Sequence, residues 1–160
     1  MRRLKDFSRK FEDQRGFLKV LYEDSNFVLK KSFTKANTFR GMHYQKPPYE
    51  QKKIIRVVTG AIIDFWMSVD QESTKLQVLH KVITPVDGWC FISEKFAHGF
   101  LTLEDTSFEY LCLGGYSEEN ETVYNISERI REFFDQDAVF SKKDTSGNPI
   151  DVNFSEIVQS

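Results

Sequence analysis

Short apolar runs rich in β-branched and aromatic residues recur through the chain, and turn-forming residues separate them. Such runs predict β-strands. The predicted strands cover residues 53–58, 61–70, 77–83, 88–92, 99–103 and 108–113, and a further strand-like region over 17–28 is interrupted at 24–26. Many short strands with little helix between them favour an antiparallel sandwich or barrel over a parallel α/β layout.

The strongest turn signal is Thr59-Gly60, which predicts a β-hairpin between residues 53–58 and 61–70. Residues 46–49 contain two prolines and predict a loop, because proline lacks the N–H that a central strand needs. Residues 30–38 are polar and weakly patterned, so no regular element is predicted there.

One short helix is predicted over residues 127–134, with Ser127 as its cap. Its apolar face would consist of Ile130, Phe133 and Phe134. Residues 140–149 have the composition of a polar tail segment. At the other end, the spacing of Leu4, Phe7 and Phe11 fits a short helix and a bent strand equally.

The composition fits one globular domain over residues 1–160. The chain contains 15 Phe, 6 Tyr and 2 Trp, and such side chains suit sheets and the walls of pockets. A net charge of −2 gives no electrostatic basis for a nucleic-acid or membrane-surface partner.

The apolar runs fall short of the ~20 residues that span a bilayer. The basic first residues lack the apolar segment of a secretory signal. Cys90 and Cys112 are not in a CxxC arrangement, which predicts no disulfide framework. We therefore expect a reduced, cytoplasmic protein.

Two segments, residues 39–45 and 94–100, each place a histidine beside a glycine and near aromatic residues. Glycine leaves room for a ligand to approach the backbone, and histidine can move a proton near neutral pH. The two histidines, His43 and His98, are predicted to lie on opposite walls of one pocket.

The first of these segments has an unusual spacing. Arg40 precedes His43 by three residues, so on a regular strand the two side chains would point to opposite faces. Gly41 lies between them and makes a local turn inexpensive. An ordinary histidine hydrogen-bonded within the sheet is the alternative interpretation of His43.

A metal site is the second alternative, because metal-binding barrels use two closely spaced histidines, a glutamate and a later histidine. That set is incomplete here. His43 is followed by Tyr44 and Gln45, and His80 lies on an alternating run where it is expected to face solvent. No metal is therefore expected.

Without a metal, the two histidines combine with other residues into a set suited to proton transfer beside a carbonyl group: Lys53, Tyr110, Tyr116 and Asp144. Such chemistry needs a base, a donor to the enolate oxygen and an acid on the opposite side. The tyrosines also fit simple sheet packing, and Lys53 also fits a solvated strand end.

Residues 40–45, 51–60 and 96–101 resemble the dTDP-4-dehydrorhamnose 3,5-epimerase family in order and spacing, and 13–17 and 141–144 resemble its terminal motifs. The likeness covers about residues 7–150. It implies an all-β, cupin-like antiparallel jelly roll with short helices near the C-terminus. It also implies a homodimer that acts without metal or cofactor on a nucleotide-linked 4-keto-6-deoxysugar.

The resemblance also implies roles for residues. His43 would be the general base, Asp144 its carboxylate partner and Tyr110 the acid on the opposite face, while Lys53 and His98 would face the keto oxygen. The predicted substrate-binding residues are Arg15 and Arg40, which would hold the diphosphate, and Glu121, Lys143 and Tyr116.

The chain departs from the family pattern at the nucleotide end. Val28-Leu29-Lys30 stands where the family has a Gln-Asp-Asn run, Val20 stands where a glutamate is expected, and Gly115-Tyr116 replaces paired tyrosines. The family's Trp-Asn-Asp-Pro segment is not recognisable around residues 124–126. This predicts an epimerase with an altered nucleobase site.

Three other functions remain compatible with this sequence. A ketoisomerase or single-centre epimerase would share the proton chemistry. A non-catalytic sugar-nucleotide binding module would share the pocket but has no need of an acid and a base. A metal-dependent cupin oxygenase would share the barrel.

Overall fold

The computed structural model describes residues 9–157, and most of them lie in two β-sheets. The first sheet has the order β1 (Arg9–Asp13), β2 (Gly16–Glu23), β3 (Phe27–Thr34), β10 (Thr106–Leu113), β5 (Lys52–Thr59) and β8 (Cys90–Ile92). The second has the order β12 (Asn148–Pro149), β11 (Glu121–Asn125), β4 (Phe39–Gln45), β9 (Phe96–Thr102), β6 (Ile62–Ser68), β7 (Leu76–Ile83) and β13 (Val152–Glu156).

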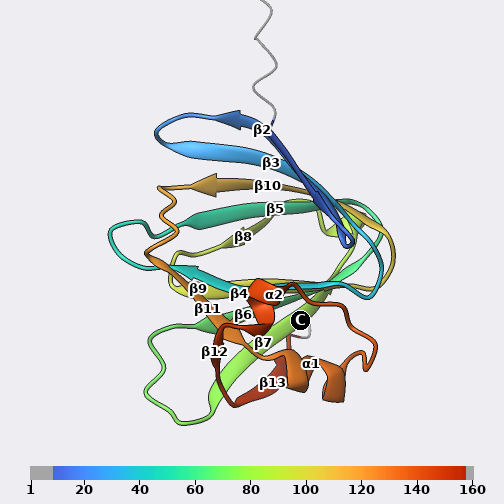
Figure 1. The fold of residues 1–160 in the computed structure, drawn as a ribbon, viewed down its shortest axis with the longest axis vertical. Coiled ribbons are helices and arrows are strands. Elements are labelled where there is room, and N and C mark those ends of the chain that lie inside the picture. Colours follow the sequence, from blue (N-terminus) through green and yellow to red (C-terminus); the bar gives the residue numbers. More distant parts are fainter. Residues whose placement is uncertain (1–8, 158–160) are drawn as a thin grey trace, which may run out of the picture.

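The helical elements are short: η1 (Pro85–Asp87), α1 (Ser127–Phe133) and α2 (Lys142–Thr145). In Figure 1 the first sheet occupies the upper part of the molecule and the second sheet the lower part, with α1 at the lower right beside β13. The strand pairs are antiparallel except β11 with β12 and β7 with β13. The prediction of a cupin-like jelly roll with short C-terminal helices is confirmed.

The predicted hairpin at Thr59-Gly60 is wrong. β5 pairs with β10 and β8 in the first sheet, whereas β6 pairs with β7 and β9 in the second, so the turn carries the chain from one sheet to the other. Gly60 has φ +88°, and a Cβ there would lie 2.4 Å from Oγ1 of Thr106. Alternation shows which face of a strand is buried, but it does not identify the neighbouring strand.

Residues 30–38, for which no element was predicted, contain the end of β3. This strand lies between β2 and β10, and its inward-facing positions include Ser32 and Thr34, which are buried. Polar residues on the inner face remove the apolar alternation that identifies a strand. The backbone ladders on both sides nevertheless hold it in place.

Two apolar clusters form the core. One lies between the sheets and includes Ile55 and Phe108 from the first and Ile62 and Phe100 from the second. The other covers the opposite face of the second sheet and includes Ile130 of α1. Burying each large side chain contributes roughly 1.5–3 kcal/mol. Phe140 also packs against this second cluster, whereas residues 141–149, which belong to the predicted polar tail segment, form α2 and β12 and are mostly exposed.

The predicted helix is confirmed over most of its length, but its details differ. Ile126 occupies the capping position, and Ser127 is buried with its hydroxyl donating to Oδ1 of Asn125. Ile130 faces the core as predicted, whereas Phe133 is 53% exposed. A helix of two turns has too few residues for spacing alone to define its buried face.

His80 does not face solvent as predicted. Its ring packs against Phe65, Phe134 and Phe154, and its Nδ1 is buried without a hydrogen-bond partner among the described residues. Phe154 comes from β13, the strand that pairs with β7, on which His80 lies.

At the N-terminus, Leu4 and Phe7 lie outside the described residues, and Phe11 lies in strand β1 with its side chain 58% exposed. Across residues 9–157, the helices are all too short and polar to cross a lipid bilayer.

Candidate active site

A cavity of about 430 Å³ opens between the two sheets. β2, β3, β5 and β10 form one side of it, and β4, β9, β11 and α2 form the other. All ten predicted site residues line this cavity: Arg15, Arg40, His43, Lys53, His98, Tyr110, Tyr116, Glu121, Lys143 and Asp144. Residues separated by more than a hundred positions in the sequence therefore share one surface.

A β-bulge brings both Arg40 and His43 into the cavity. The register of β4 against β9 shifts between these two residues, so side chains three positions apart share a face. Gly41 has φ +137°, and a Cβ there would lie 2.4 Å from Cα of Gly99. The glycines thus give room to the neighbouring strand, and the expectation that they give room to a ligand is corrected.

The two histidines lie on the same wall. His43 on β4 pairs directly with His98 on β9, which corrects the prediction of opposite walls. The other wall is the first sheet, which contributes Lys53 from β5 and Tyr110 from β10. The predicted base and acid therefore do face the cavity from different sheets.

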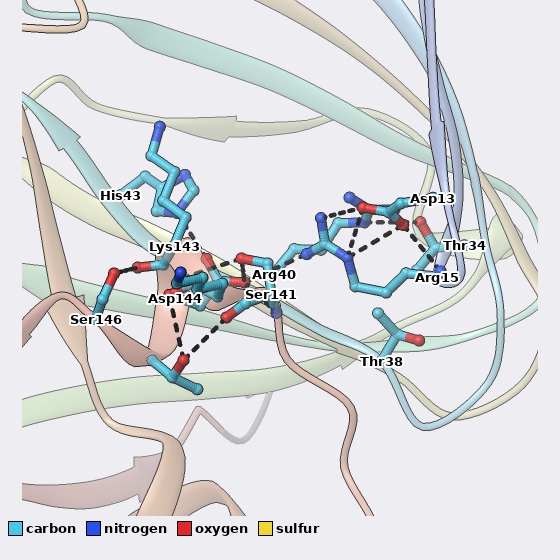
Figure 2. Close-up of polar contacts among 12 residues, drawn as sticks. Asp13, Arg15, Thr34, Thr38, Arg40, His43, Ser141, Lys143, Asp144 and Ser146 are labelled. Atoms are coloured by element: carbon cyan, nitrogen blue, oxygen red, sulfur yellow. Dashed lines mark hydrogen bonds and ion pairs between the residues drawn. The ribbon is translucent and has the colours of Figure 1, made fainter.

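Asp144 lies behind His43. Its Oδ1 is 2.9 Å from Nε2 of His43, and its Oδ2 accepts hydrogen bonds from the hydroxyl (2.6 Å) and backbone N–H (3.2 Å) of Ser141 and from Arg15 (3.3 Å). Figure 2 shows this network around Asp144. Burial alone would raise the pKa of Asp144, but the bonds from His43 and Ser141 outweigh it and hold the pKa below the ordinary value.

The short helix α2 makes this geometry possible. Ser141 caps α2 and exchanges hydrogen bonds with Asp144 in a capping box, which fixes the carboxylate at the first turn. Only 2% of Asp144 is exposed. A buried, ionised carboxylate with three partners suits the task of orienting an imidazole and stabilising its cationic form.

The second ring nitrogen of His43, Nδ1, lies 3.4 Å from Oε1 of Glu121. The other oxygen of Glu121 forms an ion pair with Lys143 and accepts a hydrogen bond of 3.2 Å from the hydroxyl of Tyr116. Three residues predicted as substrate-binding are therefore linked to one another beside the predicted base.

Sequence reasoning missed Asp64, which lies behind His98. Its Oδ1 is 2.6 Å from Nε2 of His98, and its side chain is 0% exposed. The available signal was a single acid within the apolar run 61–67. Such a residue is rarely buried without a partner.

Two arginines also line the cavity. Arg15 and Arg40 lie at one end; Arg15 pairs with Asp13 at 2.7 Å, and Nε of Arg40 donates to Thr34 at 3.2 Å (Figure 2). Burial and the charge of Arg15 lower the pKa of Arg40. Neither Arg40 nor Lys53 forms an ion pair with any residue from 9 to 157.

The wall formed by the first sheet carries Lys53, Tyr110 and Lys30. Burial lowers the pKa of Lys53 and raises that of Tyr110 well above its ordinary range. Nζ of Lys30 lies 5.5 Å from the centre of the Tyr110 ring. Both Lys53 and Tyr110 are thus shifted towards their uncharged forms.

No cluster of three or more His, Cys, Asp or Glu suited to a metal ion occurs in the part of the chain that the structure describes. Both histidines instead have a carboxylate partner, and that arrangement suits proton transfer.

Residues 7–151 match the dTDP-4-dehydrorhamnose 3,5-epimerase family. The enzyme of that name from Escherichia coli (strain K12) is 30% identical over 127 residues, which cover 71% of this chain and 69% of the relative. The counterpart from Salmonella typhimurium is 30% identical over 125 residues, covering 69% of this chain and 68% of the relative.

Solved structures of enzymes with the same name are also similar to this chain. The dTDP-4-dehydrorhamnose 3,5-epimerase from Bacillus anthracis, with TDP and PPi bound, has a TM-score of 0.67 at 26% identity, covering 89% of this chain and 91% of that one. The enzyme from Sulfolobus tokodaii has a TM-score of 0.68 at 28% identity, covering 88% and 85%. The chain therefore belongs to the dTDP-4-dehydrorhamnose 3,5-epimerase family, whose named members are carbohydrate isomerases.

Proposed function

We propose that this protein is an epimerase that inverts C3, C5 or both carbons of a nucleotide-linked 4-keto-6-deoxysugar. His43 is the base and Tyr110 the acid. The observation that carries the proposal is the placement of His43, backed by Asp144, and Tyr110 on different sheets around one cavity. Inversion needs this separation, because a proton leaves one face of the sugar ring and another arrives on the opposite face.

The reaction follows from the acidity of carbons beside a ketone. His43 takes the proton from such a carbon through Nδ1, and the electron pair moves onto the keto oxygen to form an enolate. The ionised Asp144 stabilises the resulting imidazolium. When the carbonyl re-forms, Tyr110 gives its phenolic proton to the opposite face of the same carbon. Solvent then returns a proton to Tyr110 and takes one from His43.

Lys53 and His98 are assigned to the keto oxygen. Both line the cavity, one from each sheet, so an oxygen bound between them would meet two donors. Donors already in place where negative charge develops lower the barrier without reorganisation. The raised pKa of Tyr110 keeps its phenol protonated at neutral pH, as an acid requires.

Arg15 and Arg40 are assigned to the diphosphate. Their guanidinium groups lie at one end of the cavity, and Arg40 has no carboxylate partner among the described residues. A planar guanidinium donates two parallel hydrogen bonds to phosphate oxygens. The related enzyme from Bacillus anthracis was solved with TDP and PPi bound, which supports a nucleotide-diphosphate ligand.

The base of the nucleotide is proposed to differ from that of the family's substrate. Val28 is buried and Lys30 lines the cavity, at the two positions where the family has the amide side chains Gln and Asn. A lysine offers only donors, whereas an amide offers a donor and an acceptor. A site with Lys30 would therefore bind the hydrogen-bonding edge of a pyrimidine differently from a site with an amide at this position.

The test offers dTDP-, UDP-, CDP- and GDP-linked 4-keto-6-deoxysugars to the enzyme in deuterated water. We expect solvent deuterium at C3, C5 or both in at least one of them, and NMR of the product separates inversion of one carbon, inversion of two carbons and movement of the carbonyl. Heat-inactivated protein is the control. No incorporation into any of the four would overturn the proposal.

We also propose that the protein is a homodimer joined through the outer face of the first sheet. Five apolar residues form a row across five neighbouring strands of this sheet, each paired with the next: Tyr22, Leu29, Leu111, Ile54 and Phe91. They point away from the cavity, because their strand neighbours Lys30, Tyr110 and Ile55 line it. Tyr22 and Phe91 are 38% and 62% exposed. An apolar row of this length favours a protein partner.

Light scattering of the purified protein tests this arrangement. Wild type is expected to have twice the mass of one chain, and Leu111→Lys combined with Phe91→Lys is expected to be a monomer. Val86→Lys, at a residue that is 94% exposed and outside the row, is the matched control and should remain a dimer. A double variant that stays dimeric would show that another surface is used.

A further inference from the structure

Asp64 is a fully buried acid to which the proposed reaction assigns no task. It lies on β6, its side chain is 0% exposed, and its Oδ1 is 2.6 Å from Nε2 of His98. Its Oδ2 has no hydrogen-bond partner among the described residues. An ionised carboxylate with one such oxygen is costly to bury, whereas a protonated one avoids most of that cost.

The electrostatics of the site favour a bound proton. Burial raises the pKa of Asp64, and the nearby charges of His98 and Lys53 offset this only in part. The strand neighbours of Asp64 add no further partner: Phe100 on β9 is apolar, and Lys81 on β7 pairs with Asp87 at 3.0 Å. The Asp64–His98 pair is thus well placed to hold one proton more than an ionised acid beside a neutral imidazole.

The location of that proton decides what His98 presents to the cavity. Nε2 is committed to Asp64, so Nδ1 is the ring nitrogen left for a ligand. If Asp64 were ionised and His98 neutral, the ring hydrogen would lie on Nε2 and Nδ1 would be an acceptor. An acceptor facing a keto oxygen or an enolate would repel it.

One extra proton on the pair reverses this outcome. A protonated Asp64 donates to Nε2 and leaves the hydrogen on Nδ1; an ionised Asp64 beside an imidazolium also leaves a hydrogen on Nδ1. In both cases Nδ1 is a donor. In the protonated case the second oxygen, Oδ2, is an uncharged carbonyl oxygen, which costs less to bury without a partner than the oxygen of an ionised carboxylate.

We propose that Asp64 is a positioning residue that keeps one proton on the Asp64–His98 pair, so that Nδ1 of His98 donates to the carbonyl oxygen of the substrate and to the enolate. This inference rests on the proposed function for the identity of the oxygen. The state of the pair in the free protein is independent of it.

The first test is a spectroscopic one on the unliganded wild type. With ¹⁵N-labelled histidine, Nδ1 of His98 is expected to show the chemical shift of a protonated nitrogen near pH 7.5, and His98→Gln identifies the signal. The shift of an unprotonated nitrogen at Nδ1 would overturn the inference. This readout needs no turnover, so it also distinguishes failure of the inference from failure of the proposed function.

The second test removes the acid while keeping the branched shape of its side chain. Asp64→Leu is expected to lose the protonated Nδ1 signal and to reduce kcat for deuterium exchange by about 100-fold with little change in KM. Asp70→Asn, at an exposed acid two residues after β6, is the matched control and should change neither. If Asp64→Leu does not fold, Asp64→Asn is measured by the same NMR experiment: its amide N–H can donate to Nε2, so Nδ1 is expected to stay protonated, and an unprotonated Nδ1 in this variant would overturn the inference. A protonated Nδ1 together with wild-type exchange in Asp64→Leu would overturn the role of Asp64.

Discussion

The two histidine–aspartate pairs of the cavity use the same residue types in opposite surroundings. His43 has a side chain that is 31% exposed, and its partner Asp144 receives further hydrogen bonds that lower its pKa. His98 is 8% exposed, and its partner Asp64 has one oxygen without a partner and a raised pKa. The first carboxylate is held ionised, and the second is pushed towards its protonated form.

In the proposed reaction, this difference lets one wall of the cavity accept a proton at His43 and donate a hydrogen bond from His98. An ionised Asp144 makes His43 a better base, because it stabilises the imidazolium that forms. Asp64 with a bound proton makes His98 a donor to the developing enolate. The environments of the carboxylates, more than the histidines themselves, separate the two tasks.

Replacing the base should have the largest effect. His43→Asn is expected to reduce deuterium exchange by about 10⁴-fold, at the upper end of what general acid–base catalysis supplies. Nucleotide-sugar binding by calorimetry should stay within a few-fold of wild type, because the arginines are untouched. A variant that retained exchange would show that another group is the base, and the different surroundings of the two pairs would then not correspond to different tasks.

Removing the charge behind the base should have a smaller effect. Asp144→Asn keeps the shape of the side chain but cannot stabilise an imidazolium, so kcat is expected to fall by about 10²-fold with KM little changed. A KM raised by a similar factor, with kcat unchanged, would instead mean that Asp144 acts in substrate binding.

The same variant tests the lowered pKa of Asp144. A carboxylate whose folded-state pKa is depressed contributes stability above its ordinary pKa of 3.8, and that stability is lost as pH falls through the folded-state value. The free energy of unfolding of wild type should therefore exceed that of Asp144→Asn at neutral pH. The gap should narrow below about pH 4.

Sequence patterns predicted many of the strands because short runs rich in β-branched and aromatic residues, bounded by turn residues, mark them, as in residues 53–58 and 108–113. They could not show which strands are neighbours, so the turn at Thr59-Gly60 was assigned to a hairpin although it joins two sheets. The parallel pairing of β13 with β7 depends on contacts far apart in sequence, and no local signal records it.

The residues of the site also divide into those that the local sequence predicts and those that depend on contacts far apart in the chain. His43 and the bulge at Gly41 could be inferred locally, because a glycine permits the change of face that the spacing requires. Asp144 was predicted from family resemblance alone, since nothing near it in sequence shows that it meets a residue 101 positions away. Asp64 was missed although it is a single acid within an apolar run, because nothing near it in sequence shows that its partner is His98, 34 positions away.

The third histidine supplies the smallest predicted effect. His80 forms no ion pair with a carboxylate among residues 9–157, and burial among aromatic rings lowers its pKa from 6.5, which the nearby charge of Glu156 offsets only in part. The unfolded chain therefore takes up a proton that the folded protein resists, and the free energy of unfolding falls as pH drops below that value. His80→Phe, which keeps an apolar ring, should lose less stability than wild type between about pH 7 and pH 5. Equal losses in the free energy of unfolding of the two proteins, measured by chemical denaturation across this pH range, would contradict this.

The most direct test of the central claim, that base and acid act from different sheets, compares Tyr110→Phe with wild type in deuterated water. Without the acid, His43 should still remove the proton and return deuterium to the same face, so we expect exchange without inversion. His43→Asn should show neither. Inversion by Tyr110→Phe at the wild-type rate would contradict the assignment of Tyr110 as the acid.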